Sequence, residues 1–274
     1  MNARAFLARV PAADEDSATS AFWEAGTLGV EIRPAPGGFV DVLAYFPADA
    51  DPAAVASALP GVRVEPVDVP DVDWVARFRE GFRAFGAGSF RIVPVWDPPP
   101  PDPSRALVVD PGRAFGTGTH ETTRLCLESI ESLAARRPLG RTLDLGAGTG
   151  LLAIAASRLG ASPVVATDVD PEATASSALH ARLNRAPLRV ALVDGGRGLR
   201  AGAFDLVLAN LMAIFLVDRV AEVRPLLAPR GALVLSGLLE GDVPEVRAAY
   251  DPACGCAPAV RSLGEWAALV YELP

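Results

Sequence analysis

Three closely spaced glycines are the residues of this sequence best suited to bring the main chain against a ligand. Gly146, Gly148 and Gly150 form a G-x-G-x-G pattern, and Asp144 stands two residues before the first of them. Glycine adopts backbone dihedrals that a Cβ forbids, so such a loop permits the close approach of a bound molecule. We expect Gly146 and Gly148 to contact a cofactor, and Asp144 either to order the loop or to receive an ammonium group of the ligand.

A second acid follows the glycine loop where nucleotide-binding folds carry one. Residues 142–145 read as an apolar strand, 151–158 as a helix and 164–168 as a strand that ends on Asp168. This βαβ order binds adenosine-containing cofactors, and an acid at that strand end accepts the ribose hydroxyls. The dinucleotide fingerprint needs a third glycine where this chain has Leu151, which disfavours a nicotinamide cofactor. A structural turn that binds no ligand is the alternative.

A polar, glycine-containing segment lies upstream of the glycine loop. Residues 110–123 read D-P-G-R-A-F-G-T-G-T-H-E-T-T, which is more polar than a connection within a core requires. Such a segment can fold over a ligand. We expect Phe115 to cover an adenine ring or to wall the reaction pocket, and Thr123 to donate or accept a hydrogen bond with the cofactor.

The end of this segment predicts the start of a helix. The pattern indicates a helix over 124–134, with Thr119 as its N-cap. His120 is a candidate general base because its ordinary pKa is near neutrality. A histidine that caps the helix or braces the loop is the alternative.

These motifs together resemble one family of bacterial enzymes. The stretches are D-P-G-x-A-F-G-T-G-T-H-x-T-T at 110–123, the acid and glycines at 144–150, D-x-D-P at 168–171 and F-D-L-V-L-A-N-L at 204–211. They are similar to the methyltransferases that trimethylate the large-subunit ribosomal protein L11, and the resemblance covers essentially the whole chain. It implies S-adenosyl-L-methionine as the cofactor and a basic ribosomal protein as the partner, with methyl groups transferred to lysine side-chain and N-terminal amines.

The resemblance also implies roles for single residues. Thr123, Gly146, Asp168 and Asn210 match the cofactor-binding positions of the family. Asp194 stands where related enzymes contact the adenine amino group. Asn210 is in addition the implied catalytic residue, which orients the amine that is methylated.

The residues after Asn210 depart from a common pattern. Many amino-group methyltransferases continue with Pro-Pro-Tyr, whereas this chain has Leu211 and Met212, so the prolines and the aromatic ring are absent. A less enclosing motif suits trimethylation, because the amine must turn in the pocket between transfers. We expect no dedicated protein base, with water removing the proton of the amine.

The fold class expected is α/β, and the chain is expected to divide near residue 70. Residues 1–70 read as strand, helix, two strands, helix and strand, which is the order of a small α+β ferredoxin-like domain. Residues 71–100 read as a linker helix and loop, with an edge strand at 90–96 that its proline limits. Residues 101–274 read as a Rossmann-like seven-strand methyltransferase domain. The implied role of the N-terminal domain is recognition of the substrate.

Charge differs between the two parts of the chain. Residues 1–70 contain 4 arginines and 10 acids, a balance of −6, whereas residues 71–274 contain 21 and 23, a balance of −2, and these add to the total of −8. An acidic domain favours attraction to a basic partner. A merely solvated acidic face is the alternative.

Composition excludes several other classes of protein. The chain of 274 residues is 50% hydrophobic and 21% charged, as globular proteins are, and has no apolar run of the roughly 18 residues that span a membrane. We expect a cytoplasmic protein without a signal peptide, no direct nucleic-acid binding and no metal site. Three cysteines, with Cys254 and Cys256 as a lone C-x-C, do not form a disulfide framework.

Two other functions remain open from the sequence. In the first, the chain is a methyltransferase whose acceptor is a different protein lysine or a small amine. In the second, the chain is a non-catalytic module that binds S-adenosyl-L-methionine. The oligomeric state is left open as well.

Overall fold

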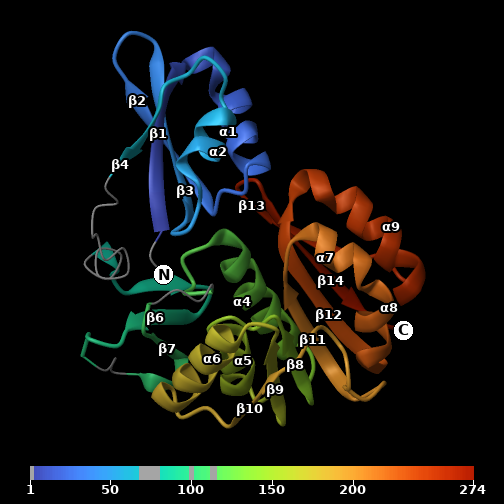
Figure 1. Cartoon of the computed structure of the whole chain (residues 1–274). Coiled ribbons are helices and arrows are strands. Elements are labelled where there is room, and N and C mark those ends of the chain that lie inside the picture. The colour runs from blue at the N-terminus through green and yellow to red at the C-terminus, as the bar shows by residue number, and fades with distance from the viewer. Residues whose placement is uncertain (1–2, 68–80, 99–101, 112–115) are drawn as a thin grey trace. The chain divides into compact units, whose positions relative to one another are not determined.

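The computed structural model describes residues 3–67, 81–98, 102–111 and 116–274. The chain forms two compact units, Met1–Trp74 and Val75–Pro274 (Figure 1). The linker helix expected after residue 70 falls almost entirely on residues 68–80, which lie outside the described part of the chain. No helix in that described part is both long enough and apolar enough to cross a membrane.

The N-terminal unit is a four-stranded antiparallel sheet with order β2-β3-β1-β4. Its elements follow the β-α-β-β-α-β order expected from the sequence. They are β1 (Ala3–Pro11), the 3-10 helix η1 (Ala12–Asp14), α1 (Glu15–Glu24), β2 (Gly29–Ala35), β3 (Phe39–Pro47), α2 (Pro52–Ser57) and β4 (Val64–Val67).

One core holds this unit together. Strand β3 alternates outward and inward side chains, and its inward residues include Val42 and Phe46. Both helices contribute to the same cluster, α1 through Phe22 and α2 through Val55. Phe46 meets Phe6 and Phe22 edge to face at centroid distances of 5.7 and 6.0 Å. Burial of these rings and aliphatic chains is the main term that favours folding of the unit.

A three-stranded sheet opens the C-terminal unit. It contains β5 (Phe85–Ala87), β6 (Phe90–Pro94) and β7 (Ala106–Val109), with the 3-10 helix η2 (Pro103–Arg105) before β7. The prediction of an edge strand at 90–96 was wrong, because β6 is the middle strand, antiparallel to β5 and parallel to β7. Pro94 is tolerated there because it is the last residue of the strand, and the next amide, Val95 N, donates to Val109 O at 2.7 Å.

The seven-stranded sheet that the sequence predicted forms the centre of this unit. Its order is β10-β9-β8-β11-β12-β14-β13, and the strands are parallel except β14, which is antiparallel to both of its neighbours. The strands are β8 (Thr142–Leu145), β9 (Val164–Asp168), β10 (Leu188–Leu192), β11 (Phe204–Asn210), β12 (Leu227–Leu239), β13 (Ala259–Leu263) and β14 (Trp266–Glu272).

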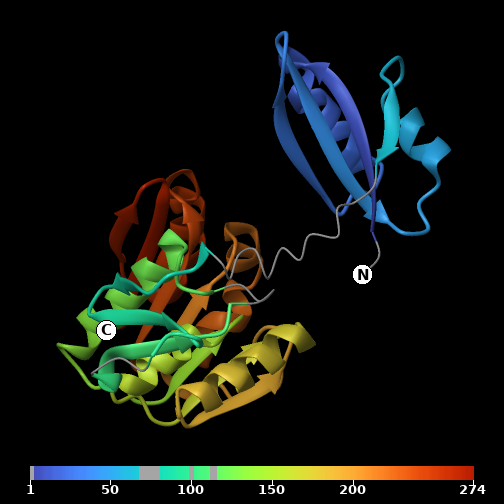
Figure 2. The same cartoon turned by 90° about the vertical axis from the view of Figure 1, so that its left-hand side faces the viewer.

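Helices cover both faces of this sheet. In Figure 2 the red strands β13 and β14 lie at one edge and the yellow helix α6 lies beside the opposite edge. The helices are α4 (Glu121–Ala134), α5 (Leu151–Arg158), α6 (Pro171–Leu183), α7 (Ala213–Asp218), α8 (Val220–Val223) and α9 (Val243–Cys254), with the 3-10 helices η3 (Arg224–Leu226) and η4 (Glu240–Asp242).

The strand residues of β11 show how the two faces are filled. Leu206 and Leu208 belong to the core that α4 and α5 cover, whereas Val207 and Ala209 belong to the core that α7, α8 and α9 cover. All four are buried, as expected for a parallel strand with helices on both sides.

The order of the strands creates a crevice. From β8 the chain moves outward through β9 to β10, and β11 then returns to the other side of β8. In open α/β sheets a ligand binds where the direction reverses, outside the carboxyl ends of the strands. The site is therefore expected at the ends of β8 and β11.

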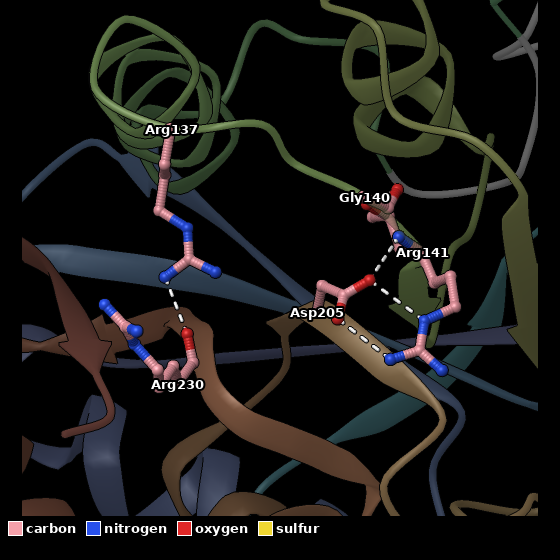
Figure 3. Close-up of polar contacts among 6 residues, drawn as sticks. Arg137, Gly140, Arg141, Asp205 and Arg230 are labelled. Atoms are coloured by element: carbon pink, nitrogen blue, oxygen red, sulfur yellow. Dashed lines mark hydrogen bonds and ion pairs between the residues drawn. The ribbon is translucent and has the colours of Figure 1, made fainter.

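The opposite ends of β8 and β11 are fastened together (Figure 3). Asp205 accepts three hydrogen bonds from Arg141, at 2.9 Å each, from the backbone N, Nε and Nη2. A Cβ on Gly140, which has φ +62°, would lie 2.5 Å from Asp205 Oδ2. Beside them Arg137 Nη1 donates to Arg230 O at 2.7 Å. These contacts fix the amino ends of the two strands whose carboxyl ends form the crevice.

Candidate active site

The glycine loop between β8 and α5 uses left-handed backbone conformations. Gly146, Gly148 and Gly150 have φ of +70°, +56° and +74°. The amides of Gly146 and Ala147 donate to Thr167 O at 2.8 and 2.9 Å, which holds the loop against the end of β9. A Cβ on Gly146 would lie 2.5 Å from the Leu211 side chain. Residues with side chains are therefore strained or blocked at these positions.

Asp144 orders the helix that follows the loop. Its side chain is buried, and Oδ2 accepts a hydrogen bond from Ala153 N at 3.0 Å, in the first turn of α5. The residue before that helix is Gly150, which has no side chain to cap it. Burial raises the pKa of the Asp144 carboxyl to about 7, and the nearby charge of Asp168 acts in the same direction.

Asp168 is held by two backbone amides. Gly148 N donates to Oδ2 at 2.9 Å and Asp170 N donates to Oδ1 at 3.0 Å. Asp170 in turn caps α6 by accepting from Glu172 N at 2.8 Å. The Asp168 carboxylate is thus fixed in orientation at the end of β9, where it lines the larger of the two cavities described below.

Two buried oxygens at the end of the sheet have no hydrogen-bond partner among the described residues. They are Thr123 Oγ1, on α4, and Asn210 Oδ1, at the end of β11. Both residues line a small cavity of about 20 Å³ together with Asp144 and Gly146. Leaving a buried polar atom unsatisfied costs about 1–3 kcal/mol, so a hydrogen-bond partner is expected there, and a cavity of this volume holds about one water-sized group. Thr167 Oγ1 shares this lack of a described partner.

A larger cleft of about 670 Å³ adjoins this cavity and shares Gly146 and Asn210 with it. Its volume lies within the range of small-molecule sites, about 300–1,000 Å³. The side chains around it come from every layer of the unit. They include His120, Asp168, Asp194, Met212, Phe215, Arg219 and Trp266.

Asp194 lies on the cleft with cationic partners. The strand before it, β10, ends at Leu192. Asp194 Oδ1 is 2.9 Å from Arg219 Nη1, and Oδ2 is 3.6 Å from Arg197 Nη1. These ion pairs hold the carboxylate at the cleft wall, and its contact with an adenine stays a prediction.

His120 caps a helix. It is the N-cap of α4, with Nδ1 accepting from Thr122 N at 3.3 Å and lying 2.8 Å from Thr122 Oγ1. The prediction of Thr119 as the cap and of a helix start at 124 was wrong, because the histidine ring reaches the free amide and α4 begins at Glu121. The capping alternative for His120 therefore describes its observed contacts.

The structure brings together most of the predicted site residues. Thr123, Gly146 and Asn210 line the small cavity, while Gly148, Asp168 and Asp194 line the cleft beside it. Phe115 lies outside the described residues. In the described part of the chain no group of three or more His, Cys, Asp or Glu side chains is arranged to hold a metal ion.

Sequence reasoning missed Trp266 as a site residue. It is the first residue of β14, and its position at the cleft depends on β14 running opposite to its neighbours. That reversal brings the start of β14 to the edge of the sheet where the parallel strands end. A tryptophan directly after the turn Gly264-Glu265 was the available signal.

The sheet order and the crevice define a class of protein. A seven-stranded, mostly parallel sheet with its penultimate strand reversed, and a glycine loop at the switch point, is the Rossmann-like methyltransferase fold. The family model described as Ribosomal protein L11 methyltransferase (PrmA) matches residues 11–273, and the chain belongs to this family.

Individual relatives agree with this assignment. The Ribosomal protein L11 methyltransferase of Geobacter sulfurreducens is 42% identical over 206 residues, which cover 74% of this chain and 67% of that protein. The protein of the same name from Pelobacter propionicus is 39% identical over 252 residues, or 84% and 81% of the two chains. The crystal structure of ribosomal protein L11 methylase from Lactobacillus delbrueckii subsp. bulgaricus superposes with a TM-score of 0.63 at 29% identity and covers 70% of this chain and 100% of that one.

Proposed function

We propose that this protein transfers methyl groups from S-adenosyl-L-methionine to lysine side-chain and N-terminal amines of ribosomal protein L11. The observation that carries the proposal is the pair of buried, unsatisfied oxygens, Thr123 Oγ1 and Asn210 Oδ1, beside the glycine loop. A ligand with N–H donors at one end fits that pair. Membership of the L11 methyltransferase family supplies the acceptor.

The residues of the cleft suit the parts of this cofactor. Asp168, fixed by Gly148 N and Asp170 N, would receive the two ribose hydroxyls on the remaining lone pairs of its carboxylate. Gly146 and Gly148 would let the methionine portion approach the main chain, and Thr123 would bind its polar end. Asp194 would face the adenine amino group. When bound, S-adenosyl-L-methionine supplies an activated methyl group on a sulfonium centre.

Asn210 would position the acceptor. Its Oδ1 has two lone pairs, so beside an N–H of the cofactor it can accept an N–H of the incoming amine, which directs the nitrogen lone pair toward the methyl group. The neutral amide does not itself remove a proton. An amine that enters a partly desolvated site beside a positive sulfonium has a lowered pKa, so water can take the proton.

The contacts of His120 support this arrangement without a protein base. Its Nδ1 is engaged by Thr122 at the start of α4, and its ring meets Trp266 edge-on. We assign His120 to bracing of the cleft wall. Loss of its side chain is therefore expected to leave measurable methylation.

We assign residues 1–70 to recognition of the acceptor and 101–274 to methyl transfer; of the expected linker 71–100, strands β5 and β6 belong to the C-terminal unit. The balance of −6 on residues 1–70 suits a basic ribosomal protein. Strands β5 and β6 pack into the core of the C-terminal unit through Ala87, Phe90 and Ile92. A shortened chain that lacks the N-terminal unit should thus begin near residue 71, so that β5 and β6 are kept. A cytoplasmic location follows from the proposed substrate.

Incubation with radiolabelled S-adenosyl-L-methionine tests the function. The acceptors are total ribosomal proteins from a strain that lacks its own L11 methylation, with the same proteins from a methylating strain as the control. We expect label on L11 of the first set alone, with the methylated amines located by mass spectrometry of peptides. Label on a different protein would show that this protein, and not L11, is the acceptor. Cofactor binding by calorimetry with no label on any protein would make the chain a binding module.

A further inference from the structure

The cleft contains an aromatic side chain that the motif after Asn210 does not provide. Trp266 and Asn210 both line the cleft of about 670 Å³. Strand β12 lies between them, since Asn210 pairs with Ser236 and Trp266 pairs with Leu239. Strands β11 and β14 are therefore two strand spacings, about 10 Å, apart. Trp266 also lies three register positions farther along β12 than Asn210, since its partner Leu239 follows Ser236 by three residues.

Gly237 of β12 lines the cleft, and the Leu211 backbone packs against it. The register of β12 against β14 shifts between Leu235 and Leu238, which marks a bulge next to the cleft. Gly237 occupies the bulge with φ +83°, and a Cβ there would collide with the Leu211 carbonyl oxygen. Gly237 therefore contributes main chain and no side chain to the cleft wall, and the Leu211 backbone fills the space where a Cβ would stand.

The indole is braced from one side. The rings of His120 and Trp266 meet edge to face, with centroids 4.6 Å apart and planes at 69°. His120 is in turn fixed by its capping contacts with Thr122. Both rings line the cleft. The orientation of the indole is thus set by α4 as well as by β14.

We propose that Trp266 is the aromatic wall that holds the methylated ammonium of the acceptor between successive transfers. This proposal rests on the proposed function. Each transfer forms one N–C bond, breaks the S–C bond of the sulfonium to leave a neutral thioether, and requires the amine to have lost one proton to water beforehand. Every added methyl group also removes one N–H donor.

The two residues divide the binding of the acceptor according to its methylation state. Asn210 Oδ1 needs an N–H and binds the unmodified amine best. The face of an indole attracts a cation whatever its number of N–H groups, as in the aromatic cages that bind methylated lysine. Trp266 consequently contributes most after the first transfer, when Asn210 contributes least.

Product distribution measures this division. L11 is incubated with excess cofactor and the wild-type protein, Trp266→Phe or Trp266→Leu, and the methylation state of each amine is followed by mass spectrometry. We expect Trp266→Leu to slow the third transfer about tenfold relative to the first, so that mono- and dimethylated products accumulate. Trp266→Phe should retain trimethylation because it keeps a ring. Equal slowing of all three transfers in Trp266→Leu would make Trp266 merely structural, and unchanged trimethylation would overturn the proposal.

A binding measurement stays informative if L11 is not the acceptor. Tetramethylammonium chloride and ammonium chloride are titrated separately into the ¹⁵N-labelled wild-type protein, and the tryptophan indole N–H resonances are recorded. Trp266→Phe identifies the Trp266 resonance, and Trp96→Phe, which changes an exposed ring outside the cleft, serves as the matched control. We expect a saturable shift of the Trp266 resonance with tetramethylammonium alone. No shift, or equal shifts with both salts, would overturn the proposal whatever the acceptor.

Discussion

The hydroxyl of Thr149 donates a hydrogen bond of 2.6 Å to the carbonyl oxygen of Gly116. The two residues belong to different motifs, the glycine loop and the polar segment upstream of α4. Gly116 has φ +95°, and a Cβ there would lie 3.1 Å from Thr149 Oγ1. The upstream segment is therefore tied directly to the loop that is proposed to bind the cofactor, and Gly116 and Thr149 both line the small cavity.

Loss of this tie should weaken cofactor binding. Thr149→Val keeps the shape of the side chain and removes the donor, and we expect S-adenosyl-L-methionine affinity to fall by about 1 kcal/mol, the typical net value of one hydrogen bond. Thr149→Ser keeps the hydroxyl and should bind nearly as the wild type does. Isothermal titration calorimetry of both variants decides the matter. Equal affinity in Thr149→Val and the wild type would show that the contact does not support the site.

Asp168 should contribute to cofactor affinity through its charge. Replacement by alanine is expected to weaken S-adenosyl-L-methionine binding by ~1.5–3 kcal/mol, the range for hydrogen bonds to a charged group. Asp168→Asn is the matched control, since it keeps one oxygen for Gly148 N. It should bind more tightly than the alanine variant and less tightly than the wild type. Unchanged affinity in Asp168→Ala would refute the assignment to the ribose.

Asn210 and Thr123 should differ in which kinetic constant they affect. If Asn210 aligns the amine, Asn210→Ala lowers kcat by much more than it lowers cofactor affinity, because lost alignment raises the barrier. Thr123→Val, which removes the other unsatisfied oxygen of the small cavity, should mainly weaken cofactor binding. Measured kcat and cofactor Kd for both variants make the comparison. Parallel losses of both constants in Asn210→Ala would leave it as a cofactor ligand only.

Asp144 should make stability depend on pH. Its pKa is raised from 3.8 to about 7, first by burial, so the folded state keeps a proton that the unfolded state releases. The stabilisation is fully present below about pH 4 and is lost as pH rises through about 7. Asp144→Asn is neutral at every pH and keeps an acceptor for Ala153 N. As pH rises from about 4 to about 7, we expect the free energy of unfolding of Asp144→Asn to increase relative to that of the wild type by up to about 4 kcal/mol.

Urea unfolding at several pH values provides this comparison. A difference between Asp144→Asn and the wild type that does not change from pH 4 to 8 would mean that the carboxyl is ionised throughout the range. The charged Asp144 carboxylate of the folded protein would then have to contact water or a cation.

Removal of residues 1–70 should separate cofactor binding from recognition. All the described residues proposed to bind the cofactor lie in the C-terminal unit, so the shortened chain is expected to bind S-adenosyl-L-methionine with near wild-type affinity. Its kcat/KM for L11 should collapse. Calorimetric unfolding of the shortened chain first establishes that it is folded. Equal kcat/KM for L11 in the shortened and full chains would show that residues 1–70 do not recognise the acceptor.

Raising the salt concentration should also slow methylation of L11 by the full chain, because the Debye length falls from ~10 Å at 0.1 M to ~3 Å at 1 M.

The elements that the sequence predicted well are those with strong local patterns. The unit around the glycine loop follows from apolar runs bounded by glycines, and its observed strand and helix bounds, 142–145, 151–158 and 164–168, match the expected ones. The position of β6 did not follow, because the partner strands β5 and β7 are short and neither was predicted from the sequence. Pairing between strands is a long-range property that a single segment does not encode.

The site shows the same limit. Asp144, Gly146 and Asp168 lie within one supersecondary unit, whose motif implies their proximity. Trp266 comes to the cleft only through the reversed direction of β14. This position leaves no pattern of spacing in the sequence.

The fastening between Arg141 and Asp205 also bears on how the chain finds its fold during synthesis. Until β11 is made, β8 has one unpaired edge, which is a place for faulty pairing. A slip of one residue between β11 and β8 would exchange the two faces of β11 and draw Asn210 away from the glycine loop. Asp205 can take all three Arg141 hydrogen bonds only in the correct register. An ion pair at the far end of the sheet thus acts as a check on assembly of the site.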